Sequence, residues 1–413
     1  MIRKNKNFVG VTLKSIYLLL PTILALLVGC NSSTSTNNEV ETIPPENFSF
    51  PITKSQVLDL AIAKYKLQAT RLSPDEGYIR EATNGQWHQQ NWKDWTDGFF
   101  PGVLWQLALL DESLIPLADK WTTPLEGHKD FDNHDLGFIF NNSYGKALRL
   151  TNDDKYSPPL EFAANHLSRR YSPQVMAIRS WDFGNFAYPV IIDNMMNLDL
   201  LWYSAKQYNL ANHYQIAEQH ALTTQQNHLR DNGTSFHLVD FSPSSGEVVN
   251  KQTVQGFANS STWARGQAWG IYGFTLAYVE TNNKNFLASA QKLADYFIST
   301  LPTDGVPAWD FDLRADQNIK DSSAAVIAAS AIWQLSQAVS SEESIRYQQA
   351  SKALINNLLN DNYLDINPNS PALLKKASGN VPANKEVETS LIYADYYFIE
   401  VLMLQINKIT LPS

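Results

Sequence analysis

Apolar residues recur at three- and four-residue spacing through most of the chain from about residue 55 onward, which is the period of an amphipathic α-helix. The alternating pattern of a strand is sparse by comparison. The pattern therefore predicts an all-α fold. Twelve segments carry the helical period: 54–69, 98–111, 112–126, 135–151, 157–170, 190–208, 211–229, 263–280, 284–300, 322–338, 342–360 and 388–407.

The predicted helices differ in how much of their surface is polar. Segments 262–278 (TWARGQAWGIYGFTLAY) and 322–335 are apolar or aromatic nearly all round, whereas 212–230 and 342–360 carry polar residues on much of their surface. An apolar helix is buried and a half-polar one faces water. From about residue 190 the two kinds alternate, as a toroid of six helical hairpins would require, although the period equally permits an open helical solenoid.

One strand pair is predicted among the helices. Residues 235–240 and 246–254 have strand character, and the turn Ser242-Pro243-Ser244-Ser245-Gly246 lies between them. We expect a small β-hairpin inserted into the helical fold.

The N-terminus is predicted to be a targeting segment rather than part of the fold. An apolar run, 16–28, follows a basic stretch and is short for a membrane span. It ends at Leu27-Val28-Gly29-Cys30, which resembles the lipobox of bacterial lipoproteins; an ordinary secretory signal with a stray cysteine is the alternative. We expect a signal peptide at 1–29, a flexible tether at 30–50 from a lipidated Cys30, and a folded domain at 51–413. The basic residues are Arg3, Lys4, Lys6 and Lys14.

Composition narrows the class of protein. With 413 residues, of which 44% are hydrophobic and 18% charged, the chain can bury a large core, which excludes a disordered protein. A formal charge of -9 argues against a nucleic-acid partner. The single cysteine excludes an intrachain disulfide, and the 8 histidines show no metal-ligand spacing, so we expect no metal and no cofactor. The 11 tryptophans could provide a stacking surface for a ring-shaped ligand.

Candidate catalytic carboxylates lie where two helices are predicted to begin. Asp135 opens one helix, and Asp193 opens another between the apolar residues Ile192 and Met195. Aspartate is also a favoured helix cap, which is the alternative for each residue taken alone. A buried carboxylate tends to have a raised pKa, which suits a proton donor near neutral pH. Two such carboxylates could divide the acid and base roles between them.

Seven segments together resemble the unsaturated glucuronyl hydrolases, glycoside hydrolase family 88. The resemblance implies an (α/α)6 barrel with the small β-hairpin insertion and favours the closed toroid over the solenoid. The segments are 95–102 (WTDGFFPG), 134–138 (HDLGF), 191–198 (IIDNMMNL), 263–270 (WARGQAWG), 307–311 (PAWDF), 321–325 (DSSAA) and 390–398 (SLIYADYYF).

The resemblance also implies an activity. Family members are exo-acting enzymes that remove the 4,5-unsaturated uronic acid left at the non-reducing end by polysaccharide lyases. They protonate C4 of the enol ether, add water at C5, and release the sugar when the hemiketal opens. The implied partner is an unsaturated uronide-terminated oligosaccharide, with or without sulfate. The lipobox-like sequence before Cys30 places the expected location at the bacterial cell envelope, on its periplasmic face or outer surface, with the lipid anchor as the only membrane contact.

The family's functional residues map onto particular positions of this chain. Asp193 matches the acid/base aspartate, and Asp135 matches the supporting one, with Asp132 as the alternative. His237 and Gln255 match the active-site histidine and glutamine, although a lone histidine is more often a half-buried strand residue. Arg265 and Trp269 match residues that line the sugar site, and Trp95 matches an aromatic wall.

Two of these residues have structural alternatives. Arg265 could bind the substrate carboxylate through two parallel hydrogen bonds, or it could pair with Asp310 or Asp312. Trp269 could stack on a sugar or be part of the core.

Two other functions remain open at this point. The unsaturated rhamnogalacturonyl hydrolases would share the barrel and the acid chemistry, whereas a non-catalytic surface glycan-binding lipoprotein would need the aromatic surface but not Asp193. The parent polysaccharide is not readable from the sequence. We expect residues 84–90 and the loop that contains Lys375, Lys376 and Asn380 to determine it.

Overall fold

A computed structural model describes residues 48–314 and 317–406, all of which belong to one compact unit, Pro45–Ser413. The predicted signal peptide, Cys30 and most of the tether lie outside the described residues. Among the helices that are described, none combines the length and the apolar character needed to cross a membrane.

All twelve predicted helical segments contain helix, so the mainly helical class is confirmed. The segment 135–151 is divided into a π-helix, η4, and a short α-helix, α4. The helices are α1 Lys54–Arg71, α2 Phe99–Ala108, α3 Ile115–Thr122, η4 Gly137–Gly145, α4 Lys146–Thr151, α5 Ser157–Ser168, α6 Asn194–Gln207, α7 Ala211–His228, α8 Ala264–Thr281, α9 Lys284–Ser299, α10 Ser322–Ser336, α11 Ser341–Asn356 and α12 Ile392–Gln405. Short 3-10 turns are η1 Pro74–Glu76, η2 Glu112–Leu114, η3 Thr123–His128, η5 Asp154–Tyr156 and η6 Val381–Ala383.

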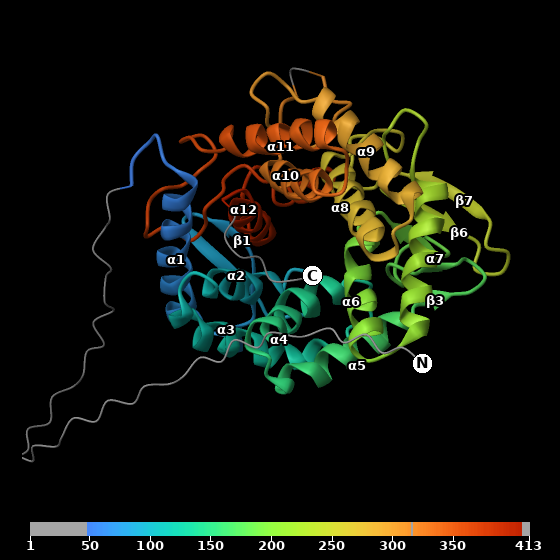
Figure 1. The fold of residues 1–413 in the computed structure, drawn as a ribbon, viewed down its shortest axis with the longest axis horizontal. Coiled ribbons are helices and arrows are strands. Elements are labelled where there is room, and N and C mark those ends of the chain that lie inside the picture. Colours follow the sequence, from blue (N-terminus) through green and yellow to red (C-terminus); the bar gives the residue numbers. More distant parts are fainter. Residues whose placement is uncertain (1–47, 315–316, 407–413) are drawn as a thin grey trace, which may run out of the picture. The chain divides into compact units, whose positions relative to one another are not determined.

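Six of these elements form a closed cycle of contacts within the unit. Each of these elements contacts the next one along the chain, and the last contacts the first: α2, η4, α6, α8, α10, α12 and again α2. The remaining long helices pack against this inner set: α3 on α2, α5 on η4, α7 on α6, α9 on α8, α11 on α10, and α1 on both α12 and α2. Figure 1 shows the outer helices surrounding the inner ones. The contact between α12 and α2 excludes an open solenoid.

Burial follows the predicted difference between the helices. Every residue of α10 except Gln334 is buried, and all ten residues of α2 are buried. In α11 only Tyr347, Ser351, Leu354 and Ile355 are buried. Apolar helices therefore form the inner ring and half-polar helices cover it, as hydrophobic burial requires.

Glycine allows the inner helices to approach closely at two places. A Cβ atom on Gly273 of α8 would lie 2.3 Å from Cβ of Met195 in α6. A Cβ atom on Gly137 of η4 would lie 2.5 Å from Cα of Asn197, also in α6. No real side chain tolerates such distances, so α6 packs backbone to backbone against both of its neighbours.

The predicted β-hairpin is confirmed, and a second hairpin was missed. β6 (Leu238–Phe241) pairs with β7 (Val248–Gln252), and β5 (Pro189–Ile191) joins the other edge of β6. The missed hairpin joins β1 (Tyr78–Thr83) to β2 (Gln86–Gln90) through Asn84 and Gly85, whose φ angles are 52° and 75°. An Asn-Gly pair with two positive φ angles is the preferred two-residue hairpin turn, so the signal was present in the sequence. The remaining strands are β3 (Tyr171–Ser172), β4 (Ala177–Ile178) and β8 (Ser390–Leu391), of which β8 pairs with β1.

Candidate active site

A cavity of about 260 Å³ lies where several inner helices begin. Asp135 precedes η4, Asp193 precedes α6, and Arg265 and Tyr393 are in the first turns of α8 and α12. Asp135 and Tyr393 are more than 250 positions apart along the chain. The closed cycle of helices brings all four residues together. The cavity is also lined by Arg80, Trp95, Asn133, His134, Phe138, Trp181, Phe183, Ile191, Gln255, Gly379, Asn380 and Glu386.

Asp193 occupies the cap position of α6 but does not cap the helix. Its side chain accepts no capping hydrogen bond, and its Oδ2 atom is buried without a hydrogen-bond partner among the described residues. Burial is the main reason that the pKa of Asp193 rises to about 7, and the nearby carboxylate of Asp135 raises it further, while His134 and Arg265 lower it. A carboxyl group with this pKa is protonated often enough near neutral pH to donate a proton.

His237 faces Asp193 from the start of β6. Its Nε2 atom lies 3.6 Å from Asp193 Oδ2, and its Nδ1 atom accepts a hydrogen bond of 3.2 Å from the backbone N–H of Gln255. Burial, with a further contribution from Arg265, lowers the pKa of His237 to about 3, so the ring is neutral. Because Nδ1 is an acceptor, the single ring proton is on Nε2 and points toward Asp193.

His134 and Asp135 form a second pair on the wall of the cavity. His134 Nε2 lies 3.0 Å from Asp135 Oδ1, and His134 Nδ1 lies 2.8 Å from the carbonyl oxygen of Ser180. Asn197 Nδ2 also donates to Asp135 Oδ1 at 3.3 Å, which fixes the orientation of the carboxylate.

The structure distinguishes between the two candidates for the supporting carboxylate. Asp135 is 7% exposed and lines the cavity. The side chain of Asp132 is 76% exposed, forms an ion pair with Arg170, and does not line this cavity. Of these two candidates, only Asp135 lies in the wall of the cavity.

Arg265 is occupied by protein partners, and they are not the ones considered from the sequence. Nη1 donates to Asp321 Oδ2 at 3.1 Å and to the carbonyl oxygen of Ser378, while Nη2 donates to Gln255 Oε1 at 3.1 Å and to the carbonyl oxygen of Gly379 at 2.5 Å. Both terminal nitrogens thus use both of their protons, so a two-point contact with a substrate carboxylate is not available to them. Arg265 instead holds Gln255 and the loop at 378–379 in place.

The pairing with Asp310 or Asp312 is also wrong, for a geometric reason. Asp310 accepts hydrogen bonds from the side chain of Ser261 and the backbone of Phe257, and Asp312 accepts one from the backbone of Thr262. These carboxylates fix the loop before α8 rather than the guanidinium.

The two candidate tryptophans have different environments. Trp95 lines the cavity, with its ring centroid 4.8 Å from that of Tyr393. Trp269 is 0% exposed, is not part of the lining, and packs against Phe138 and Tyr397 at 5.3 Å and 5.4 Å. The expectation that Trp269 stacks on a sugar does not fit this position, because Trp269 is fully buried and contacts the lining residue Phe138 rather than the cavity.

Several lining residues were not identified from the sequence. The hydroxyl group of Tyr393 is buried and has no hydrogen-bond partner among the described residues, although the segment that contains it was noted. Trp181 and Phe183 stack at 5.5 Å on a loop before β5, and Phe183 is 70% exposed. Arg80 lines the cavity from the hairpin that was missed, where it pairs with Glu386. Exposed aromatic residues at a cavity entrance could have been a signal for a ligand site.

Within the described ranges no cluster of three or more histidine, cysteine or acidic residues could hold a metal ion. The arrangement instead combines a protonatable carboxyl group, a neutral histidine that donates toward it, a second oriented carboxylate, and aromatic walls. These groups can transfer a proton to a bound ligand and stabilise the positive charge that results.

Comparisons with known proteins identify the family of the chain. A scan against models of protein families finds no match. The chain is 37% identical to an unsaturated glucuronyl hydrolase of Formosa agariphila over 407 residues, which cover 96% of this chain and 99% of that protein. It is 31% identical to an unsaturated glucuronyl hydrolase of Bacillus sp. strain GL1 over 326 residues, 75% of this chain and 85% of that protein. The crystal structure of an unsaturated glucuronyl hydrolase specific for heparin matches with a TM-score of 0.83 at 37% identity and covers 87% of this chain and 99% of that one. The chain belongs to the unsaturated glucuronyl hydrolases.

Proposed function

We propose that this protein removes the 4,5-unsaturated uronic acid from the non-reducing end of oligosaccharides left by polysaccharide lyases, and that Asp193 supplies the proton. The observation that carries the assignment is a carboxyl group with a pKa of about 7 in a cavity wall, with its Oδ2 atom free of any hydrogen bond to the described residues. Family membership supports the type of reaction, and the position of Asp193 supports its assignment as the acid.

The proposed reaction begins with proton transfer from Asp193 to C4 of the enol ether. The electron pair of the double bond forms the new C–H bond, and positive charge develops at C5 and the ring oxygen. Water then adds at C5 and returns a proton to the Asp193 carboxylate. The hemiketal opens and releases the remaining sugar, so Asp193 ends the cycle protonated.

The neighbours of Asp193 support both halves of this cycle. His237 is neutral and its Nε2 atom lies 3.6 Å from Asp193 Oδ2, so it faces the carboxyl group without competing for its proton. Asp135 adds negative charge on the same cavity wall, where it can stabilise the developing cation. Trp95 and Tyr393 provide a wall against which a sugar ring can pack.

The fold that supports the site is proposed to be an (α/α)6 barrel with the β6–β7 hairpin as an insertion. The closed contact cycle of α2, η4, α6, α8, α10 and α12, each with an outer partner, supports this classification.

We further propose that the protein is attached to the bacterial cell envelope by a lipid on Cys30, with the domain at 51–413 held off the membrane by a tether. The support is the sequence pattern before Cys30. Metabolic labelling with a fatty acid tests this proposal, because a Cys30→Ala variant should lose the label and leave the membrane fraction.

A panel of lyase-generated unsaturated disaccharides tests the activity and the substrate class together. Turnover removes the conjugated double bond, so its ultraviolet absorbance should fall with the wild type and persist with Asp193→Asn. Glycosaminoglycan disaccharides belong in the panel because one relative is described as specific for heparin and another, from Streptococcus pneumoniae, as an unsaturated chondroitin disaccharide hydrolase. Unsaturated rhamnogalacturonyl substrates belong there as the second candidate. Full turnover by Asp193→Asn would show that the acid has been assigned wrongly.

A further inference from the structure

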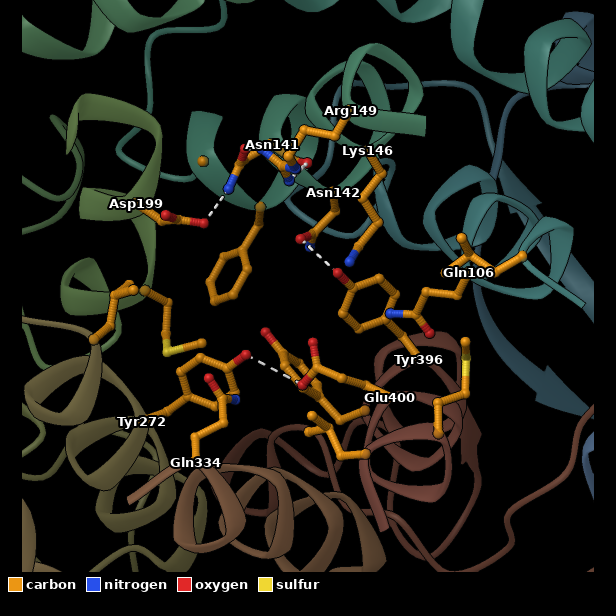
Figure 2. Close-up of a pocket in the computed structure, with 18 residues that line it drawn as sticks. Gln106, Asn141, Asn142, Lys146, Arg149, Asp199, Tyr272, Gln334, Tyr396 and Glu400 are labelled. Carbon is orange, nitrogen blue, oxygen red and sulfur yellow. Dashed lines mark hydrogen bonds between the residues drawn. The ribbon is translucent and has the colours of Figure 1, made fainter. Parts of the chain in front are cut away.

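A second cavity, of about 320 Å³, lies within the inner ring of helices. Phe138 lines both this cavity and the candidate active site, so its ring stands between the two. Figure 2 shows that the second cavity is surrounded by polar and tyrosine side chains from opposite sides of the ring. Its volume is in the range of sites that bind small molecules.

Polar groups in this cavity lack protein partners. Gln106 of α2 is 3% exposed, and neither its Oε1 nor its Nε2 atom forms a well-aligned hydrogen bond with another described residue. Tyr396 interacts with this amide, but its hydroxyl group donates to Asn142 Oδ1 at 2.8 Å. The Nδ2 atom of Asn142 also lacks a partner within the described part of the chain. Leaving a buried amide without partners is unfavourable, so these groups require a ligand or water.

Lys146 adds a further unpaired donor. Its ammonium group lies 5.4 Å from the centroid of the Tyr396 ring and has no hydrogen bond or ion pair to the described residues. Figure 2 shows its nitrogen directed inward, toward Asn142 and Tyr396. Burial lowers the pKa of Lys146 to about 8, although Glu400 and Asp199 oppose the change.

The charged groups of the cavity balance one another. Lys146 and Arg149 are matched by Asp199 and Glu400. Glu400 accepts a hydrogen bond of 3.1 Å from Tyr272. Asn141 connects the other two charged residues, because its Oδ1 atom accepts from Arg149 and its Nδ2 atom donates to Asp199. With two basic and two acidic side chains in its lining, the cavity shows no clear preference for an anion or a cation.

We propose that this cavity binds a small uncharged polyhydroxylated molecule, either a free neutral sugar or a polyol. A hydroxyl group both donates and accepts hydrogen bonds, so it can satisfy Gln106 Oε1 as a donor and Gln106 Nε2, Asn142 Nδ2 and Lys146 as an acceptor. The rings of Tyr272 and Tyr396 provide apolar surface for the C–H groups of such a ligand. The site is separate from the one that hydrolyses the substrate.

Calorimetric titration of the Asp193→Asn protein tests the proposal without turnover. D-Glucose and N-acetyl-D-glucosamine represent free sugars, and myo-inositol represents polyols. We expect at least one of them to bind, and binding to persist when the candidate active site is saturated with an unsaturated disaccharide. The compound that binds shows whether the ligand is a free sugar or a polyol. Absence of binding by all three at millimolar concentration, or competition with the disaccharide, would overturn the proposal.

Substitutions in the second cavity locate the binding. Gln106→Leu keeps the approximate volume and removes both unpaired amide atoms, so it should weaken binding about tenfold or more without loss of thermal stability. Lys146→Met removes the unpaired ammonium group and serves as an independent variant if Gln106→Leu does not fold. Equal affinity in a folded variant of either kind, or a sugar-soaked crystal in which only water occupies the cavity, would refute the site.

Discussion

Replacement of Asp193 by asparagine should stabilise the protein, but only above the pH at which this aspartate ionises in the unfolded chain. Burial is the main cause that raises the pKa of Asp193 from 3.8 to about 7. The folded protein therefore holds this proton more tightly than the unfolded chain does. Between these two pKa values the unfolded chain has lost the proton and the folded protein has not, so wild-type stability falls as the pH rises. Asparagine has nearly the same shape and does not titrate.

The magnitude follows from the interval between the two pKa values. Each pH unit of that interval is worth about 1.4 kcal/mol, so the interval from 3.8 to about 7 gives an advantage to Asp193→Asn of about 4 kcal/mol above pH 7. The advantage should be close to zero below pH 4 and should grow steadily in between. The side chain is 13% exposed, so solvent screening removes little of this effect.

Urea unfolding curves of both proteins at several pH values from 4 to 8 measure this difference directly. Asp132→Asn is a matched control, because it also removes a carboxylate but breaks an exposed ion pair with Arg170. We expect that control to leave stability unchanged or to lower it slightly. If Asp193→Asn had no advantage at pH 8, or the same advantage at pH 4, burial would not be the origin of the raised pKa.

Four further outcomes follow from the site. Activity measured as kcat/KM should fall about tenfold per pH unit above about pH 7, as Asp193 loses its proton, and a constant rate to pH 9 would exclude it as the acid. Arg265→Lys loses several hydrogen bonds of the guanidinium fork and should lower the free energy of unfolding by about 3 kcal/mol, measured in urea, together with kcat/KM. Trp269→Phe should lower stability by about 1–2 kcal/mol with KM unchanged, whereas a raised KM at native stability would return this residue to the sugar site. Trp95→Ala should raise KM for the disaccharide, and an unchanged KM would remove it from the binding wall.

The fold could be predicted from the sequence because its main signal is local. Helical period and the contrast between apolar and half-polar helices identified both rings, and the polar Ser242–Gly246 turn identified one hairpin. The second hairpin was missed although Asn84-Gly85 is a local turn signal, because residues 78–90 show little apolar alternation. One of its strands, β1, is completed by β8, which lies about 300 positions later in the chain.

The site was predictable where burial could be inferred from neighbours in the sequence. Asp193 stands between apolar residues, and the structure places it in a cavity wall with a raised pKa. The partners of Arg265 could not be anticipated, because Ser378 and Gly379 are more than 100 positions away and contribute backbone atoms that carry no sequence signal. Trp269 was placed in the sugar site by its motif, whereas its contacts with Phe138 and Tyr397 depend on how three elements pack.

The closing contact between α12 and α2 has a consequence for synthesis of the protein on the ribosome. The helix α12 packs against α2, which lies near the start of the domain. The two helices that close the cycle are therefore separated by most of the domain's sequence. Loops of that length close slowly, and they can close only after residue 405 has left the exit tunnel. Nascent chains that stop before residue 390 lack both the strand β8 and Tyr393, so they should not be active.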